Sequence, residues 1–430
     1  MTTQANPAGP SLGPDHRTTP DDIAAAAERT IAVRTAVEPS VRLSVRYGVE
    51  VLLKREDRQL GRSYKVRGAY NVMSGLAEAD LARGVVAASA GNHAQGVAIS
   101  CARLGVDGHI VVPTNTPKQK RDRIVALGGD RVTLTLAGRS YDEASRAAAE
   151  LVAASGATYV HPFDDHRTIA GQGTVAHELT DQVQALGGDP ADVVLVPIGG
   201  GGLASGMATW LRHAWPGCRI VGVEPVGAAS MGAALAAGEA TTLAELDTFV
   251  DGASVGRVGG RTYPIVRDLV DEVVAVDVGA ICTEMLELYS SEGIIAEPAG
   301  ALATAALGAI DLGDARRVAC VVSGGNNDVS RYAEVLERSL VHRGLRHYFL
   351  VGFPQQPGAL RGFLDHVLAE GEDIVVFEYV KKSNRETGPA LVGIDLDEAS
   401  GLAALEDRMR TSNLDIERIP AGSPLFAFLL

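Results

Sequence analysis

The chain has 430 residues, of which 46% are hydrophobic and 21% charged, a composition typical of a globular protein with two or three domains. Its formal net charge of −14 argues against nucleic acid or an anionic membrane surface as the main partner. We find no signal peptide, no apolar run of about 18 residues and no metal or redox spacing among the four cysteines, so we expect a cytoplasmic protein with reduced thiols.

The N-terminal part of the chain changes character near residue 20. Residues 1–19 are rich in Pro, Gly and Thr, which predicts a disordered segment, and a helix is expected from Pro20. Short β-branched segments then alternate with alanine-rich helical segments, so residues 20–340 are predicted to form an α/β domain with parallel sheets covered by helices. The predicted strands are 50–54, 84–88, 108–112, 131–136, 193–198, 219–223, 273–278 and 317–322.

The first unusual segment is RSYKVRGAYN, residues 62–71, where Lys65 stands between an aromatic residue and a valine at a predicted helix start. The ordinary explanation is a lysine whose stem lies along apolar surface while its ammonium stays in water. Lys65 therefore becomes a candidate only in combination with other motifs.

The second segment is ASAGNHAQGVA, residues 88–98, which lies between a predicted strand and a predicted helix. It forms a small polar turn whose N–H groups can hold a carboxylate, and taken alone it is equally well explained as an ordinary helix start. We expect His93 to be a structural hydrogen-bonding residue rather than a base. The candidate carboxylate-binding residues are Ser89, Ala90, Gly91, Asn92 and His93.

The third segment is PIGGGGLASG, residues 197–206, with four consecutive glycines between a strand and a helix. Glycines let the backbone approach a ligand closely, and a helix N-terminus binds phosphate. The loop has neither the Lys-Ser/Thr of a P-loop nor GxGxxG, so it predicts a phosphate without a nucleotide. The candidate phosphate-binding residues are Gly199, Gly200, Gly201, Gly202 and Leu203.

Two later segments each contain one polar side chain that is a candidate for the site. Ser323, in VVSGGNND, ends a strand, where a hydroxyl would face the crevice at the carboxyl edge of the sheet, although a serine in a turn is common there. Glu297, in IIAEPAGALA, begins a helix through Pro298, and a first-turn or capping role is an equally good explanation for it.

The last part of the chain has a different order of elements. The order βαββαβ is that of a ferredoxin-like unit, which predicts a separate domain over residues 346–420. The predicted elements are strand 347–352, helix 357–370, strand 373–380, strand 389–396, helix 400–410 and strand 414–419.

The candidate groups together are those that pyridoxal 5'-phosphate requires. Its aldehyde needs an amine, its phosphate needs a cup of N–H groups, and its ring nitrogen needs a partner. Lys65 would be placed among apolar neighbours because its amine is used covalently.

The motifs also resemble those of a known family. KRED at 54–57, RSYKVRGA, SAGNHAQGVA, the tetraglycine loop, EPAGA and VSGGN resemble fold-type II pyridoxal-phosphate enzymes, and among these the biosynthetic threonine dehydratases. The tail, with YFLVGFPQQPGAL at 348–360 and FEYVKKS at 377–383, looks like the single ACT-like regulatory domain of the short bacterial form. One departure is AVEPSVRLS at 36–44, where the family commonly has a Thr-Pro-Leu segment.

The resemblance implies a role for each candidate residue. Lys65 would be the Schiff-base lysine and general base, Asn92 would bond the ring hydroxyl, and Ser323 would lie at the ring nitrogen. Residues 199–203 would hold the phosphate, and the turn 89–93 would hold the substrate carboxylate. The resemblance implies deamination of L-threonine to 2-oxobutanoate and ammonia, with L-serine as a further substrate. It also implies a homotetramer that isoleucine inhibits and valine affects.

Two alternatives remain beside this interpretation. A serine dehydratase or racemase would share the fold, but racemisation needs a second acid or base, and Ala90 stands where similar racemases have a serine. Ser230 stands where metal-dependent members would have a second carboxylate beside Glu224, so no metal site is expected. A catalytically silent amino-acid sensor is the other alternative, and the presence of Lys65 argues against it.

Overall fold

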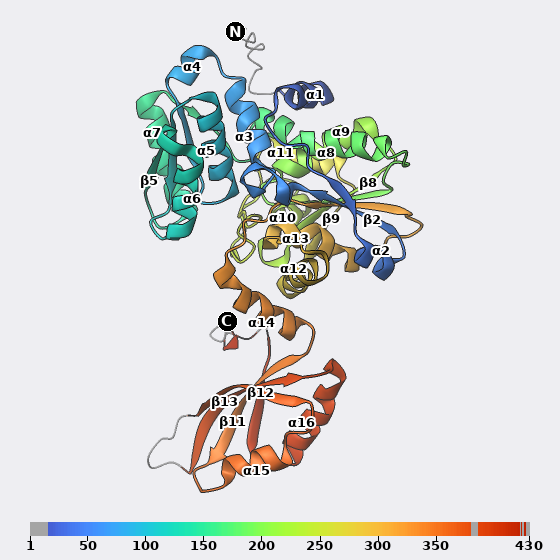
Figure 1. The fold of residues 1–430 in the computed structure, drawn as a ribbon. Helices are drawn as coiled ribbons and strands as arrows, with labels where there is room; N and C mark the ends of the chain where they lie inside the picture. The colour runs from blue at the N-terminus through green and yellow to red at the C-terminus, as the bar shows by residue number, and fades with distance from the viewer. Residues whose placement is uncertain (1–15, 380–385, 422, 424, 427–430) are drawn as a thin grey trace. The chain divides into compact units, whose positions relative to one another are not determined.

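The computed structural model describes residues 16–379, 386–421, 423, 425 and 426 (Figure 1). The chain divides into two compact units. The body comprises Met1–Val278 and Glu287–Asn327, and the C-terminal unit comprises Gly279–Leu286 and Asp328–Leu430. Among the described residues, no helix has both the length and the hydropathy that crossing a bilayer requires.

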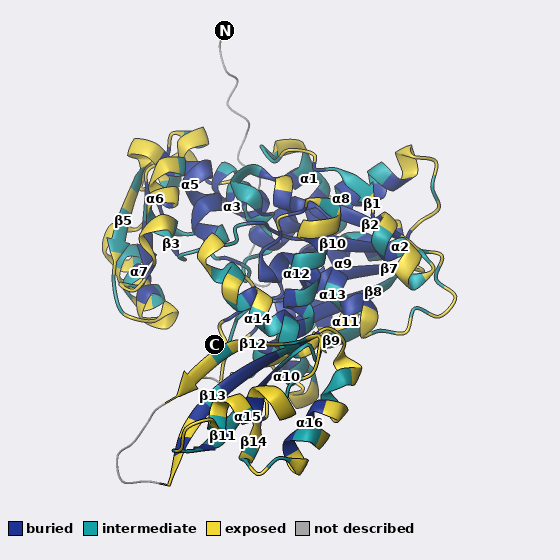
Figure 2. Cartoon of the chain, turned by 60° about the horizontal axis from the view of Figure 1, so that its bottom comes forward, coloured by how far each residue is buried: buried dark blue, intermediate teal, exposed yellow. Residues whose placement is uncertain are grey.

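The larger sheet of the body has six strands in the order β1-β2-β10-β7-β8-β9. All neighbours are parallel except β1, which pairs antiparallel with β2. Figure 2 shows central strands of this sheet in the buried colour, which explains why their sequences are almost continuously apolar. The strands are β1 (Val37–Pro39), β2 (Glu50–Arg55), β7 (Val193–Pro197), β8 (Arg219–Pro225), β9 (Glu272–Val276) and β10 (Arg317–Val322).

The smaller sheet of the body is parallel throughout, in the order β5-β4-β3-β6. Its strands are β3 (Val85–Ala88), β4 (Gly108–Val112), β5 (Val132–Leu136) and β6 (Thr158–Tyr159).

The α-helices up to residue 305 are α1 (Pro20–Arg29), α2 (Val41–Tyr47), α3 (Lys65–Ser74), α4 (Glu78–Ala82), α5 (Asn92–Leu104), α6 (Lys118–Gly128), α7 (Tyr141–Ser155), α8 (His166–Ala185), α9 (Gly202–Ala214), α10 (Ser230–Ala237), α11 (Thr262–Leu269), α12 (Val278–Glu292) and α13 (Pro298–Ala305).

The C-terminal unit is built on a four-stranded antiparallel sheet in the order β12-β13-β11-β14. Its core contains Phe349, Phe363, Val392 and Leu405, which come from both strands and helices. The elements are α14 (Tyr332–His342), β11 (Arg346–Pro354), α15 (Ala359–His366), β12 (Glu372–Tyr379), β13 (Thr387–Leu396), α16 (Leu402–Thr411) and β14 (Asp415–Ile419). The predicted order βαββαβ is therefore confirmed.

The predicted strands of the body are all present, with ends that agree to within two residues. Sequence analysis missed β1 and β6, which have three and two residues and are too short to show a period. The departing segment 36–44 forms β1 and the start of α2, which Ser40 caps by accepting a hydrogen bond from the Leu43 N–H.

The N-terminal segment is only partly described. Residues 1–15 of the predicted disordered segment 1–19 lie outside the described residues. Its last four residues, 16–19, belong to the described part of the chain. The Thr19 side chain caps α1, and Arg17 Nη1 donates to Asp268 Oδ2 at 3.1 Å. Local composition could not predict these contacts because Arg17 and Asp268 are far apart in the sequence.

Candidate active site

Lys65, the glycine loop and Ser323 all follow the carboxyl ends of strands of the larger sheet. β10 lies between β2 and β7, and the three strands are parallel. Ser323 follows β10, the glycine loop follows β7, and the segment that leads to Lys65 follows β2. Ligands of open α/β sheets bind at this edge, so the topology places the candidate residues where such a ligand is expected.

Lys65 is the first residue of α3, and the backbone before it is strained. Gly61 and Arg62 have φ of 70° and 56°, and Arg62 is the only non-glycine residue with a positive φ in the described part of the chain. This segment runs along the loop after β10, because Ser63 pairs with Gly324 in an isolated bridge. Non-glycine residues with such φ cluster at functional sites, where the surrounding structure holds them.

The start of α3 also touches α5, the helix that begins at Asn92. A Cβ atom at Gly96 would lie 3.0 Å from the carbonyl carbon and oxygen of Lys65 and from the Val66 nitrogen. Only a glycine permits this approach without a shift of the backbone. Gly96, in the motif SAGNHAQGVA, therefore brings the lysine and the polar turn together.

The Lys65 amine is half-buried and is held by a backbone oxygen. Its Nζ donates to the Pro162 carbonyl at 3.2 Å and lies 5.2 Å from the centroid of the Tyr64 ring. Within the described residues no carboxylate forms an ion pair with it. The amine is thus available to a ligand, and sequence analysis had not singled out Pro162.

The glycine loop is enclosed on its outer side. Gly201 is the N-cap of α9 with φ of +91°, and a Cβ atom there would lie 2.9 Å from Thr262. A Cβ atom at Gly200 would lie 2.3 Å from the Phe163 ring. No side chain caps α9, so the N–H groups of its first turn remain available for an anion.

Phe163 is a site residue that sequence analysis missed. It follows Pro162, which accepts from Lys65, and its ring lies against Gly200. The segment 161–164 therefore connects the lysine to the glycine loop. The available signal was HPFDD at 161–165, an aromatic and acidic run directly after a short strand.

The polar turn 89–93 joins β3 to α5. The Gly91 N–H donates to the Ser89 hydroxyl at 3.2 Å, and Gly91 is the N-cap of α5 without a side-chain cap. The His93 side chain is not directed at a ligand of this turn, because its Nε2 bonds the Val160 carbonyl at 2.7 Å. Burial, with the Lys65 charge as a second cause, lowers the pKa of His93 to about 3, so the ring is neutral. This geometry agrees with the interpretation of His93 as a structural residue.

Asn92 and Ser323 each have a defined partner in the site. Asn92 Nδ2 donates to Glu297 Oε1 at 2.6 Å, and its Oδ1 accepts from Asn326 Nδ2 at 2.6 Å. The Ser323 hydroxyl donates to the Ala299 carbonyl at 3.0 Å. The Glu297 side chain makes no capping hydrogen bond, so the capping role considered for it is wrong.

Four buried charges lie behind α3 and account for Lys54 and Glu56 of the motif KRED. Arg67 donates to Glu56 and Glu178 at 2.8–2.9 Å through both sides of its guanidinium. Lys54 Nζ donates to Glu178 Oε2 at 2.8 Å. The two positive and two negative side chains compensate one another, and they join β2, α3 and α8 two residues beyond Lys65.

Glu224 lies one residue before the end of β8 and serves as a helix cap. Its carboxylate accepts from the Met231 and Gly232 N–H groups at 2.7 and 2.9 Å, at the start of α10. Burial raises the pKa of Glu224 to about 7. No cluster of three metal-ligating side chains occurs among the residues that the structure describes.

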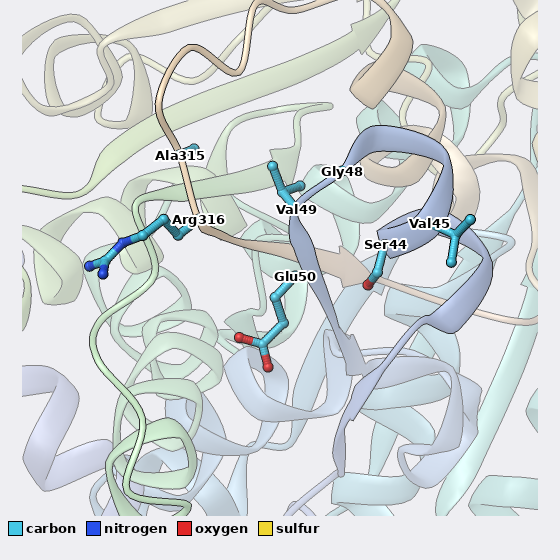
Figure 3. A pocket seen from close by; sticks show the side chains of 7 residues that line it. All are labelled: Ser44, Val45, Gly48, Val49, Glu50, Ala315 and Arg316. Atoms are coloured by element: carbon cyan, nitrogen blue, oxygen red, sulfur yellow. The ribbon is translucent and has the colours of Figure 1, made fainter.

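A surface pocket of about 510 Å³ lies at the other edge of the sheet (Figure 3). Glu50 and Arg316 stand at the amino ends of β2 and β10, whereas the candidate residues follow the carboxyl ends of these strands. The pocket is lined by Ser44, Val45, Gly48, Val49, Glu50, Ala315 and Arg316, none of which is a candidate site residue.

The C-terminal unit has a pocket of its own, of about 320 Å³. It surrounds the turn between β11 and α15, where Gly358 is the N-cap with φ of +92°. Aromatic rings form much of its wall. The lining residues are Phe353, Pro354, Gln355, Gln356, Pro357, Gly358, Ala359, Leu360, Phe377 and Tyr379.

The groups at the carboxyl edge of the body fit pyridoxal 5'-phosphate. The uncapped first turn of α9 suits its phosphate, and the Lys65 amine, without an ion-pair partner among the described residues, suits its aldehyde. The Asn92 amide and the Ser323 hydroxyl suit its ring oxygen and ring nitrogen.

Comparisons with known proteins cover nearly the whole chain. The family model "Pyridoxal-phosphate dependent enzyme" matches residues 29–324, and "C-terminal regulatory domain of Threonine dehydratase" matches residues 337–429. The chain is 54% identical to the biosynthetic L-threonine dehydratase of Mycobacterium tuberculosis over 425 residues, which is 98% of each chain.

Solved structures resemble the body. Threonine deaminase isoform 2 of Solanum lycopersicum, in its processed form, superposes with a TM-score of 0.69 at 37% identity, over 77% of this chain and 99% of that one. Maize serine racemase superposes with a TM-score of 0.68 at 33% identity, over 76% and 99%. The fold alone therefore does not separate elimination from racemisation.

Proposed function

The chain belongs to the biosynthetic threonine dehydratases of the pyridoxal-phosphate dependent enzyme family, and on this premise we propose roles for its residues and a control of its activity. The reaction is the deamination of L-threonine to 2-oxobutanoate and ammonia. Pyridoxal 5'-phosphate, when bound, supplies a conjugated ring that accepts negative charge from the substrate α-carbon.

Lys65 binds the cofactor covalently and, once released, takes the α-proton of the substrate on Nζ. The Pro162 carbonyl, 3.2 Å from Nζ, supports this role because it holds the amine between substrate turn and glycine loop. Residues 199–203 and the first turn of α9 bind the phosphate. Asn92 bonds the ring oxygen, and Ser323 bonds the ring nitrogen.

Ser323 also bears on the outcome of the reaction. A neutral hydroxyl does not enforce a proton on the ring nitrogen as an aspartate would. The ring would therefore stabilise the negative charge from the substrate α-carbon less strongly. This favours prompt loss of the β-hydroxyl over a long-lived carbanion. To bond a ring nitrogen that carries no proton, the Ser323 hydroxyl turns its single proton away from the Ala299 carbonyl, which lies 3.0 Å from Ser323 Oγ.

The turn 89–93 holds the substrate carboxylate. The uncapped N-terminus of α5 supports this assignment, because its N–H groups face an anion favourably. Ala90 has no group that carries a proton, so a second acid or base for racemisation is missing from this position of the turn. We therefore place elimination above racemisation, with L-threonine as substrate and L-serine as a second one.

The C-terminal unit is a regulatory domain, and we propose isoleucine as its inhibitor, with valine opposing it. A free amino acid would place its carboxylate at the N-terminus of α15 and its aliphatic side chain against Phe353, Phe377 and Tyr379. The pocket of about 320 Å³ around Gly358 supports this site. Coupling of this kind is typically worth about 1–3 kcal/mol, or roughly 5–150-fold in affinity.

The catalytic domain of the proposal is 20–340, and the regulatory domain is 346–420. The two compact units support a two-domain organisation, although residues 279–286 and 328–340 belong to the C-terminal unit. A homotetramer in the cytoplasm completes the proposal. The four buried, free cysteines agree with a reducing compartment.

The proposal depends on the convergence of Lys65, Ser323 and the glycine loop at one edge of the larger sheet, to which Asn92 is joined through Glu297 and Asn326. The test is release of 2-oxo acid from L-threonine and from L-serine, each with and without millimolar isoleucine. We expect turnover of threonine, and a saturation curve that isoleucine shifts. Tyr379→Ala should weaken the isoleucine effect, whereas Val375→Ala, on the same strand and equally exposed but outside the pocket, should not. A threonine curve that isoleucine leaves unchanged would show the regulatory assignment to be wrong.

A further inference from the structure

Glu297 is a buried carboxyl whose side chain is directed into the active site. It is the N-cap residue of α13, yet its side chain makes no capping hydrogen bond. Its Oε1 accepts from Asn92 Nδ2 at 2.6 Å. The same oxygen would lie 2.1 Å from a Cβ atom at Gly324, the residue after Ser323. The carboxyl therefore lies between the candidate ring-oxygen partner and the loop of the candidate ring-nitrogen partner.

Asn326 fixes the other side of the Asn92 amide. Its Nδ2 donates to Asn92 Oδ1 at 2.6 Å and to the Gly61 carbonyl at 2.7 Å. Because Asn326 donates to the backbone oxygen of Gly61, the group facing Asn92 is its nitrogen, and Asn92 must present its oxygen there. The Asn92 nitrogen then faces Glu297 and keeps one N–H for a ligand.

We propose that Glu297 is a positioning residue that, with Asn326, holds the Asn92 amide so that one N–H donates to the ring oxygen of the bound cofactor. The inference rests on the proposed role of Asn92. An amide that could rotate would present either its oxygen or its nitrogen to that position. Because Glu297 and Asn326 fix the amide, Asn92 can present only an N–H to the ring oxygen. This N–H stabilises negative charge on that oxygen without reorganisation during the reaction.

The charge of Glu297 changes within the working pH range. Burial and then the Asp251 carboxylate raise its pKa to about 7, against the opposing effect of the Asn92 amide. A hydrogen bond to a carboxylate is stronger than one to a neutral carboxyl, so the hydrogen bond from Asn92 to Glu297 becomes stronger as Glu297 loses its proton. The charged groups around it are Asp251, which pairs with Lys120 at 2.7 Å, and Arg62 and Asp57, which lie against Gly325.

The test uses full-length holoenzyme of wild type, Glu297→Gln, Asn92→Ala and the double variant. Glutamine keeps the size of glutamate and removes its charge. We expect Glu297→Gln to abolish a near-neutral transition in the absorption spectrum of the bound cofactor. We also expect kcat for threonine to fall by about tenfold with little change in KM, in the range of coupled neighbouring residues. Glu292→Gln is the matched control, because Glu292 bonds Ser40 and Arg42 outside the site.

The double variant separates positioning from an independent role. If Glu297 acts through Asn92, then Glu297→Gln adds no loss of kcat to Asn92→Ala. An equal further loss in the double variant, or a wild-type spectrum in Glu297→Gln, overturns the proposal. Failure of the wild-type protein to bind pyridoxal 5'-phosphate would instead overturn the proposed function on which this inference rests.

Discussion

Two helices of the molecule begin in almost the same way and in very different surroundings. Gly201 before α9 and Gly358 before α15 are N-cap residues with φ of +91° and +92°. A Cβ atom at Gly201 would meet Thr262 at 2.9 Å and Met231 at 3.0 Å, whereas one at Gly358 would meet nothing within 4 Å. The same backbone device therefore serves an enclosed cup in the body and an open pocket in the C-terminal unit.

The surroundings of the two glycines show how far each site is preformed before a ligand binds. In the body, the glycine loop is held by Phe163 and Thr262, so its N–H groups are already in place. In the C-terminal unit, Leu360, Phe377 and Tyr379 on the pocket wall remain 37–42% exposed, so a bound amino acid would cover apolar surface that water now reaches. A preformed cup suits a resident cofactor, and an exposed pocket suits an effector that comes and goes.

The largest effect is expected from Lys65→Ala, which removes the covalent link and leaves the enclosed cup intact. Threonine turnover should fall by about four orders of magnitude, because nucleophile and general base are lost together. The cup should still bind the cofactor, but reversibly, so dialysis should remove it from the variant and not from the wild type. Borohydride reduction of the wild type followed by peptide mapping should place the pyridoxyl group on Lys65, and a label on another lysine would contradict the assignment.

A direct test of the comparison is the pair Gly201→Ala and Gly358→Ala. Both alanines would adopt a positive φ, which costs about 1–2 kcal/mol. Only the first would also collide with its surroundings. We expect Gly201→Ala to weaken cofactor affinity by at least about tenfold in a titration followed by absorbance, and Gly358→Ala to leave it unchanged. Equal losses in both variants would show that the wall around Gly201 contributes nothing to the cup.

A smaller effect is expected at Glu224, which caps α10, the helix that carries Met231 against Gly201. Burial raises the pKa of Glu224 from 4.5 to about 7 in the folded protein. The folded state then binds more protons than the unfolded chain between these values, so stability falls as pH rises from about 4.5 to about 7, by at most about 3 kcal/mol.

Glu224→Gln should flatten this dependence. The measurement is the thermal unfolding midpoint of the cofactor-free protein at pH 5 and pH 7.5, compared with wild type. Glu245→Gln, at an exposed position of the body, is the control. A wild-type pH dependence in Glu224→Gln would contradict the burial of an ionisable carboxyl under α10.

Much of the fold could be predicted from local pattern, because parallel strands covered on both faces are short apolar runs between turn residues. The sequence positions of Lys65, the turn 89–93, the glycine loop and Ser323 were also visible, since each follows a strand or begins a helix. What was missed depends on contacts between distant residues. Phe163 reaches Gly200 across the sheet edge, and Asn326 reaches Asn92 over 234 positions.

Glu297 shows the same limit for a single side chain. Its place before Pro298 predicts a helix start, and the structure confirms that start. The direction of its carboxyl is decided by Asn92, 205 positions away, and by the absence of a side chain at Gly324. Local sequence carries no information on such a choice.

The four compensated charges behind α3 restrict how this sequence can diverge. Losing Arg67 alone would leave Glu56 buried without its positive partner and Glu178 with Lys54 only, at a cost of about 3–5 kcal/mol, which is a large part of the stability of most domains. Replacing the charges jointly by apolar side chains of similar volume can be nearly neutral. Positions 54, 56, 67 and 178 are therefore expected to change together or not at all among descendants of this chain, although the outermost two lie 124 residues apart.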